Sequence, residues 1–263
     1  MTTVRLFANV AFAAAILTLS SAEVPAEDMR DLLAPTGRLR VGVFPRSSLS
    51  MIQEVNTGET HGLSFDLGKE LARRLDVPFE AVVYQRIAEV LNAIKSGDVD
   101  FTISNATPAR ALDVAFSQTL LSLESGYLVP AGSPIMTLSD MNKSGLRVGV
   151  SKGSTSEQTL PKILANASVV AVPNLKQAVQ MLTQMELDAF ATNKAILFDM
   201  SDQIPGARVL DGRWGLEHLA VAIPKDRERG IEFVRGFVEE MRSSGLLAQA
   251  AQRAALRGAV AAE

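Results

Sequence analysis

Residues that could bind or react with a small molecule are concentrated in four short segments of the chain. The segments are 44–48, 104–110, 151–157 and 192–194, and each follows a stretch that reads as a buried strand. Their polar side chains are mainly hydroxyls and amides, with Arg46 and Arg110 as permanent cations. In the third segment, Gly153, Ser154 and Thr155 come just before a predicted helix, whose first N–H groups can bind an anion. The segments therefore predict a site for a small polar solute.

Residue types that would support catalysis or metal binding are scarce. The chain has 0 cysteines, which excludes disulfides, thiolate metal sites, a cysteine nucleophile and an acylated lipoprotein cysteine. His61 and His218 are isolated, and no carboxylate cluster has metal-ligand spacing, so we expect no metal and no cofactor. Glu157 is the one candidate general acid in the four segments. A net charge of -3 with mixed signs does not fit a nucleic-acid binder.

An internal near-repeat indicates how these segments are positioned. The pentapeptide LRVGV at 39–43 recurs at 146–150, and the segment 97–105 has a counterpart at 185–193 in the same order. Two matched strand pairs predict two similarly built lobes. Helical patterns lie between the strands, as the crossovers of parallel sheets require, and Ser64 is expected to cap one of these helices. The fold class is α/β, with two Rossmann-like lobes joined by a two-strand hinge.

The chain is expected to cross twice between the lobes. The crossings fall near 127–131 and 217–221, which assigns 38–128 plus 221–263 to the first lobe and 129–220 to the second. Because ligands of parallel α/β sheets bind beyond the carboxyl ends of the strands, the four segments should face each other across a shared cleft.

The first 22 residues read as an export signal. Arg5 precedes an uncharged stretch over 6–19, too short for a membrane span of roughly 20 residues. Ser20 and Ala22 then form a small-residue cleavage site. The alternative is a short buried helix of the folded protein. The signal predicts a periplasmic protein that starts at Glu23, with cleavage after Ala26 as the alternative.

The order and spacing of several short motifs resemble the family 3 extracellular solute-binding proteins, which have the type II periplasmic binding protein fold and include the polar amino-acid binders. The motifs that carry this resemblance are LRVGV at 39–43, GLSFDL at 62–67, SGDVD at 96–100, TPAR at 107–110 followed by Phe116 and Ser117, and VGVSKGST at 148–155.

The resemblance implies roles for two of the segments. Arg110 would hold the carboxylate of the ligand, and a guanidinium suits this role because it offers two parallel donors. The turn at Gly153, Ser154 and Thr155 would hold the same carboxylate from the other lobe. The alternatives are a surface ion pair of Arg110 with Asp113 and an ordinary helix cap at Ser154.

Other positions either follow or depart from the family pattern. Ser104, Asn105 and Thr107 are polar groups at a strand end and are expected to contact ligand. Asn193 stands where amino-acid binders usually carry an Asp that pairs with the ligand ammonium, so a ligand without an ammonium is one interpretation. The alternative for Asn193 is a helix cap.

The aromatic clamp of the family is missing, since Ser47 and Ile87 stand near the usual positions of its rings. Tyr84 and Phe44 end their strands toward the predicted cleft and could replace it, although a core position is the alternative for both. Arg46 could bind a second carboxylate at the mouth, with a solvated side chain as the alternative.

Together these features predict a monomeric periplasmic component of an ABC transporter, which binds a small carboxylate-bearing solute, such as an amino acid or related organic acid, and delivers it to an inner-membrane ABC permease. One alternative is an enzyme resembling periplasmic cyclohexadienyl or arogenate dehydratases, with Glu157 as the acid. Another is a free ligand sensor for a membrane kinase.

Overall fold

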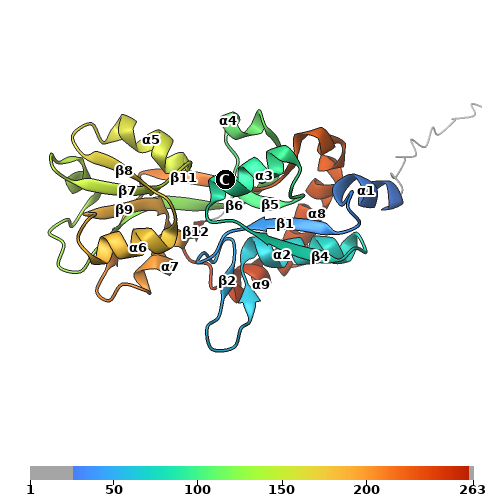
Figure 1. The fold of residues 1–263 in the computed structure, drawn as a ribbon, viewed down its shortest axis with the longest axis horizontal. Coiled ribbons are helices and arrows are strands. Elements are labelled where there is room, and N and C mark those ends of the chain that lie inside the picture. Colours follow the sequence, from blue (N-terminus) through green and yellow to red (C-terminus); the bar gives the residue numbers. More distant parts are fainter. Residues whose placement is uncertain (1–25, 261–263) are drawn as a thin grey trace, which may run out of the picture.

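A computed structural model describes residues 26–260 and arranges them as two groups of α/β elements joined by two long strands (Figure 1). The predicted export signal at 1–22 lies outside the described residues. None of the helices described is long and apolar enough to cross a membrane. In chain order the elements are α1 (Ala26–Leu33), β1 (Leu39–Val43), β2 (Ile52–Gln53), β3 (Thr60–His61), α2 (Leu63–Arg74), β4 (Phe79–Val83), α3 (Ile87–Ser96), β5 (Thr102–Asn105), α4 (Pro108–Ala111), β6 (Val114–Val129), η1 (Leu138–Asn142), β7 (Arg147–Ser151), α5 (Thr155–Ile163), β8 (Ser168–Val172), α6 (Leu175–Thr183), β9 (Ala189–Asn193), α7 (Lys194–Ser201), β10 (Arg208–Val209), β11 (Gly215–Pro224), η2 (Lys225–Gly230), α8 (Ile231–Ser243), α9 (Leu246–Arg253) and β12 (Ala259–Val260).

The first lobe contains β1, β4 and β5 with helices α1 to α4, α8 and α9 (Figure 1). β1 and β4 pair in parallel, and a bridge from Val41 to Phe101 continues the parallel arrangement toward β5. Leu67 and Leu71 of α2 belong to the same buried core as Val41. Phe237 of α8 joins this core, so the chain returns to the first lobe after the second is complete.

The second lobe repeats this arrangement with β7, β8 and β9 and helices α5, α6 and α7. β7 pairs in parallel with both β8 and β9. Val148 lies opposite Val169 on one side and Ala189 on the other, and it is fully buried. The two lobes therefore share the parallel βαβ construction that the repeated LRVGV segment predicts.

The repeat has a physical basis in two matching ion pairs. In the first lobe, Arg40 donates from its backbone N–H at 2.8 Å and its Nε at 3.0 Å to Oδ2 of Asp100. In the second lobe, Arg147 makes the same two bonds to Oδ2 of Asp188, at 2.8 and 3.0 Å. The Asp188 pair lowers the pKa of that carboxyl group. The first pair fixes β1 against the segment that leads into β5, and the second fixes β7 against the segment that leads into β9.

The glycine in each LRVGV copy is required by close packing. A Cβ atom on Gly42 would lie 2.7 Å from Cγ1 of Val90, and one on Gly149 would lie 2.5 Å from Cδ1 of Leu187. These distances are shorter than side chains allow, so both positions select glycine.

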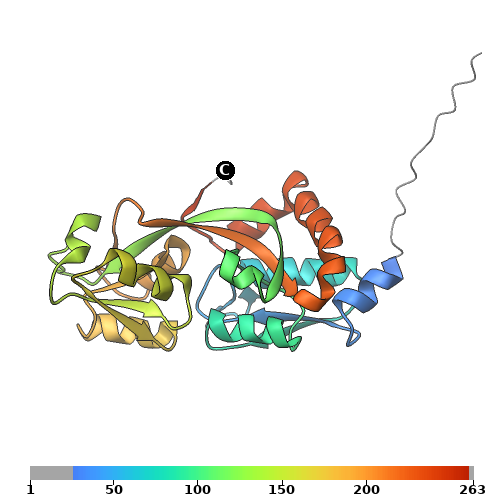
Figure 2. The same cartoon turned by 90° about the horizontal axis from the view of Figure 1, so that it is seen from above.

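Strands β6 and β11 run antiparallel to each other and connect the two lobes along one side of the molecule (Figure 2). β11 also pairs with β5 of the first lobe, and β6 pairs with β9 of the second. The predicted crossings at 127–131 and 217–221 fall on or beside these strands. That the lobes move as units with the predicted boundaries stays a prediction.

Helix α2 begins differently from the sequence prediction. Its N-cap is Gly62, with φ 146°, and it makes no side-chain cap bond. Ser64 lies inside the first turn, and its hydroxyl donates to the carbonyl oxygen of Leu49 at 3.1 Å. The prediction of Ser64 as the cap is therefore wrong. A Cβ on Gly62 would lie 2.4 Å from the carbonyl oxygen of Ser50, so glycine is favoured there by space as well as by φ.

The lobes meet through direct polar contacts near the cleft. Both the backbone N–H and the hydroxyl of Ser48 donate to Oδ2 of Asp199 at 2.8 Å, and Arg46 donates to Oε1 of Gln203 at 2.9 Å. An apolar cluster that includes Phe44 and Ile196 also contains residues of both lobes. These contacts link the loop after β1 to helices of the second lobe.

Asp199 provides a pH-dependent test of this contact. Burial raises the pKa of Asp199 from 3.8 to about 6. The hydrogen bonds from Ser48 and the positive charge of Arg257 oppose this rise, whereas the negative charge of Asp202 adds to it. The folded protein therefore holds this proton more tightly than the unfolded chain does. The resulting stabilisation is complete below about pH 4 and is lost as the pH rises toward 6.

We expect Asp199→Asn to remove this dependence. The difference in free energy of unfolding between variant and wild type should change by on the order of 3 kcal/mol between pH 4 and pH 7, in favour of the variant at the higher pH. Denaturant titrations at several pH values measure it, and other acidic groups cancel in the difference. Parallel stability curves for the two proteins would show that Asp199 titrates normally.

Candidate functional site

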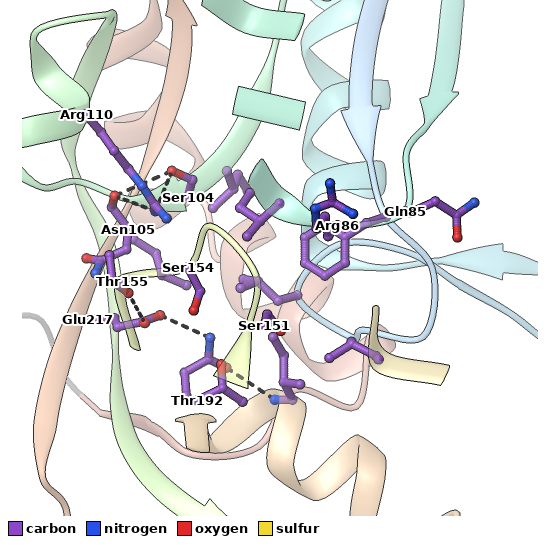
Figure 3. Close-up of a pocket in the computed structure, with 18 residues that line it drawn as sticks. Gln85, Arg86, Ser104, Asn105, Arg110, Ser151, Ser154, Thr155, Thr192 and Glu217 are labelled. Atoms are coloured by element: carbon purple, nitrogen blue, oxygen red, sulfur yellow. Dashed lines mark hydrogen bonds between the residues drawn. The ribbon is translucent and has the colours of Figure 1, made fainter. Parts of the chain in front are cut away.

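A cavity lies between the lobes, at the carboxyl ends of β1, β5, β7 and β9 (Figure 3). Its position agrees with the rule that ligands of parallel α/β sheets bind beyond the carboxyl ends of strands. Its wall combines a few charged and polar groups with apolar side chains, as in most small-molecule sites. The lining residues are Phe44, Leu49, Gln85, Arg86, Ile87, Ile103, Ser104, Asn105, Arg110, Ser151, Ser154, Thr155, Leu175, Thr192, Asn193, Ile196, Glu217 and Leu219.

Arg110 reaches the cavity from the short helix α4, which directly follows β5. Thr107 caps this helix by accepting a bond from the Arg110 N–H at 3.3 Å, and Pro108 occupies its first turn. The guanidinium donates from Nη1 to the carbonyl oxygen of Asn105 at 3.1 Å and to the hydroxyl of Ser104 at 3.4 Å (Figure 3). Both partners are neutral.

The charge of Arg110 is therefore not balanced by a direct ion pair. Across residues 26–260, no carboxylate oxygen lies within 4.0 Å of its nitrogens, and Asp113 instead pairs with Lys95 at 2.7 Å. Burial lowers the pKa of Arg110, and the charge of Glu217 partly offsets this. A half-buried guanidinium of this kind stays charged and would gain from a bound anion.

The opposite wall carries the N-terminus of helix α5. The Ser154 hydroxyl oxygen accepts a bond from the N–H of Glu157 at 3.2 Å and so caps the helix. Glu157 in turn accepts a bond from the N–H of Gly153. The first N–H groups of a helix have no intrahelical partner, and at this end they and the hydroxyl of Thr155 border the cavity. The helix cap and a ligand contact at Ser154 are thus compatible.

Glu217 is the acidic residue of the cavity wall, and it lies on the connecting strand β11. Its side chain is buried, with the residue 8% exposed. Oε1 accepts a bond from the hydroxyl of Thr155 at 2.9 Å, and Oε2 accepts one from Nδ2 of Asn193 at 3.0 Å. Asn193 also caps helix α7, because its Oδ1 accepts the N–H of Ile196 at 3.2 Å. This bond confirms the helix cap that was the alternative for Asn193.

Seven of the ten predicted ligand contacts line the cavity. They are Phe44, Ser104, Asn105, Arg110, Ser154, Thr155 and Asn193. Their role in binding a ligand stays a prediction. Phe44 is 6% exposed and also belongs to the apolar cluster shared by the lobes, so its core position and its place in the wall coexist.

The other three predicted contacts lie elsewhere in the structure. Thr107 supports Arg110 from the outer side of helix α4. Tyr84 packs among apolar residues behind the wall, where burial raises the pKa of its hydroxyl group. Arg46 has φ 67°, donates to Gln203 and borders a separate surface depression.

Sequence reasoning missed Glu217 as a member of the site. The residue falls in the predicted hinge segment, and its position near the start of a mostly apolar strand, next to exposed His218, is a weak signal. A charged residue within the segment 215–224, where most neighbours are buried, could have identified it. Gln85 and Arg86 were also missed, and they follow β4 in the position that the strand-end rule selects.

The structure does not bring Glu157 to the cavity. Its carboxylate is engaged at the start of α5, so the residue considered as a general acid lies outside the lining. Among the described residues, no group of three or more His, Asp or Glu side chains could hold a metal ion.

The fold and the cavity define a class of protein, namely a two-lobed α/β protein with a small-molecule site between its lobes. Residues 39–255 match the family model of bacterial extracellular solute-binding proteins, family 3. The chain belongs to this family.

Known proteins similar to this chain are named for amino-acid binding. The ABC transporter glutamine-binding protein of Bacillus subtilis (strain 168) is 25% identical over 249 residues, which cover 92% of this chain and 91% of that protein. A solved ancestral arginine-binding protein bound to arginine is 28% identical with a TM-score of 0.74, covering 82% of this chain and 97% of that one. An ancestral amino acid-binding protein described as a precursor of cyclohexadienyl dehydratase is 25% identical, also with a TM-score of 0.74, covering 85% of this chain and 98% of that one.

The geometry predicts the effect of removing the cavity cation. We expect Arg110→Ala to weaken binding of the tightest-binding carboxylate by about 30-fold or more, because a buried charge would lose its partner. The melting temperature of the empty protein should stay the same or rise, because Arg110 has only neutral partners in the fold. Calorimetric titration and thermal unfolding measure the two effects.

Arg46→Ala is the matched control, since it removes a cation that lies outside the cavity. It should change the affinity little, because exposed polar contacts contribute weakly. Equal affinities of wild type and Arg110→Ala would contradict the assignment of Arg110 as the anion-binding residue.

Proposed function

We propose that this protein binds a small carboxylate-bearing solute, an amino acid or a related organic acid, in the cavity between its lobes and delivers it to an inner-membrane ABC permease. The observation that carries the proposal is the guanidinium of Arg110, which faces the cavity with neutral partners alone. A permanent cation in this setting selects a ligand with a negative charge.

The second wall supports the same ligand chemistry. The helix α5 N-terminus presents N–H groups to the space in front of Arg110, whereas the hydroxyl proton of Thr155 is donated to Glu217. A carboxylate between them would be bound from both lobes at once. Since Arg110 and Thr155 belong to different lobes, the two contacts require the lobes to be close together.

This requirement gives the mechanism of delivery. A ligand held by both lobes binds the closed form more tightly than the open one and so shifts the population toward closure. The strands β6 and β11 would bend while each lobe, with the boundaries predicted from the sequence, moves as a rigid unit. A permease can then distinguish loaded from empty protein by shape.

The same proposal includes the location of the protein in the cell and its oligomeric state. We place the protein in the periplasm, after export directed by residues 1–22, as a monomer. Membership of an extracellular solute-binding family supports export, and the names of its relatives support binding rather than catalysis.

A ligand screen tests the proposed function. We expect one or a few amino acids or organic acids to raise the melting temperature of protein that starts at Glu23, because a ligand that binds only the folded state stabilises it by RT ln(1 + [L]/Kd), about 2.7 kcal/mol at 100 times Kd. The panel should contain the standard amino acids, simple amines, and mono- and dicarboxylates. Stabilisation by amines without a carboxylate, or by no member of the panel, would contradict the proposal.

A further inference from the structure

We propose that Glu217 binds the ammonium group of the solute, so that the ligand is an amino acid and the deaminated acid is rejected. This inference rests on the proposed function and specifies the ligand further. It reverses the interpretation that Asn193 alone suggests, namely a ligand without an ammonium.

The hydrogen bonds of Glu217 leave room for a cationic partner. A carboxylate has about four acceptor positions, and the structure shows two of them in use, by Thr155 and Asn193. Both donors are neutral, and in the part of the chain that the structure describes no Lys, Arg or His nitrogen lies within 4.0 Å of its oxygens. A buried carboxylate without a cation is costly, and a ligand ammonium would remove much of that cost.

Glu217 and Arg110 line the same cavity with opposite charges. Asn105 lies between them, since its carbonyl oxygen accepts from Arg110 at 3.1 Å and its Oδ1 accepts from the N–H of His218 at 3.0 Å. Burial lowers the pKa of Arg110, and the nearby charge of Glu217 partly offsets this although the two side chains form no direct ion pair. Two separated charges of opposite sign complement a zwitterion (Figure 3).

Asn193 is suited to holding this carboxylate in place. Its Oδ1 is occupied by the N–H of Ile196, and its Nδ2 donates to Glu217. The amide therefore orients Glu217 instead of contacting the ammonium itself. Thr155 orients the other oxygen, so helix α5 serves both the carboxylate and the ammonium ends of the ligand.

A purely structural role for Glu217 makes a different prediction. Because Thr155 and Asn193 belong to the second lobe, Glu217 could simply stabilise the packing of that lobe against strand β11. Loss of such a structural contact would lower the affinity for every ligand by the same factor. Loss of an ammonium partner would weaken only ligands that carry an ammonium.

The experiment compares each amino acid with its analogue that lacks the α-amino group. The wild type should bind the preferred amino acid, for example L-glutamine or L-arginine, on the order of 100-fold more tightly than the deaminated acid. In Glu217→Gln, which keeps the size of the side chain and removes its charge, this ratio should fall to below about 10. Calorimetric titration measures both dissociation constants.

Asp199→Asn is the matched control, because it removes another buried carboxylate that joins the lobes but lies outside the cavity lining. It should leave the ratio unchanged. A wild type that binds both compounds equally, or a Glu217→Gln protein that keeps the ratio, would overturn the role of Glu217 while leaving the proposed function intact. Even if the variant does not fold, a wild-type ratio near 1 would overturn the role of Glu217. Failure of every carboxylate to bind would refute the proposed function and this inference together.

Discussion

The candidate site depends on one electrostatic constraint, which is that Arg110 and Glu217 line the same cavity without forming a direct ion pair. Each is held by neutral groups: Arg110 by a carbonyl and a hydroxyl oxygen, Glu217 by a hydroxyl and an amide. Burying such charges costs free energy unless a partner of opposite sign is present. In the function we propose, a ligand that supplies both partners recovers this cost, so its binding would be selective for the charge pattern rather than for apolar surface.

The scaffold keeps the two charges in place. Arg110 is attached to β5 through a capped turn, and β5 is paired to β11, the strand that carries Glu217. The matching ion pairs at Asp100 and Asp188 fix the strands of each lobe, which is consistent with the proposal that bending occurs at the connecting strands. Precise recognition of a small molecule requires that the polar groups in contact with it are held rigidly, and strand ends provide this.

The sequence predicted the α/β fold with two lobes because its strands, crossover helices and the repeated LRVGV segment all carry strong local patterns. It also placed seven of its ten site residues at the cavity, since strand ends are set by topology. It missed Glu217 because the place of that residue in the cavity wall arises from pairing between distant segments. It expected Tyr84 at the cleft, but Tyr84 follows the end of β4 and packs among apolar residues outside the cavity lining. The prediction of Ser64 as the cap was wrong because the helix begins at Leu63, so that Ser64 lies inside the first turn and its hydroxyl donates to the carbonyl oxygen of Leu49.

The most direct test of the account is whether ligand binding closes the lobes. Small-angle X-ray scattering on the protein with and without its tightest-binding amino acid should show a smaller radius of gyration in the complex, with unchanged circular dichroism. Gly153→Ala provides the control, because a Cβ on Gly153, with φ +76°, would lie 2.4 Å from Cβ of Ala88 in the other lobe and should prevent full closure. Contraction of the wild type without contraction of the variant would support closure around the ligand, whereas identical scattering profiles of empty and loaded wild type would contradict it.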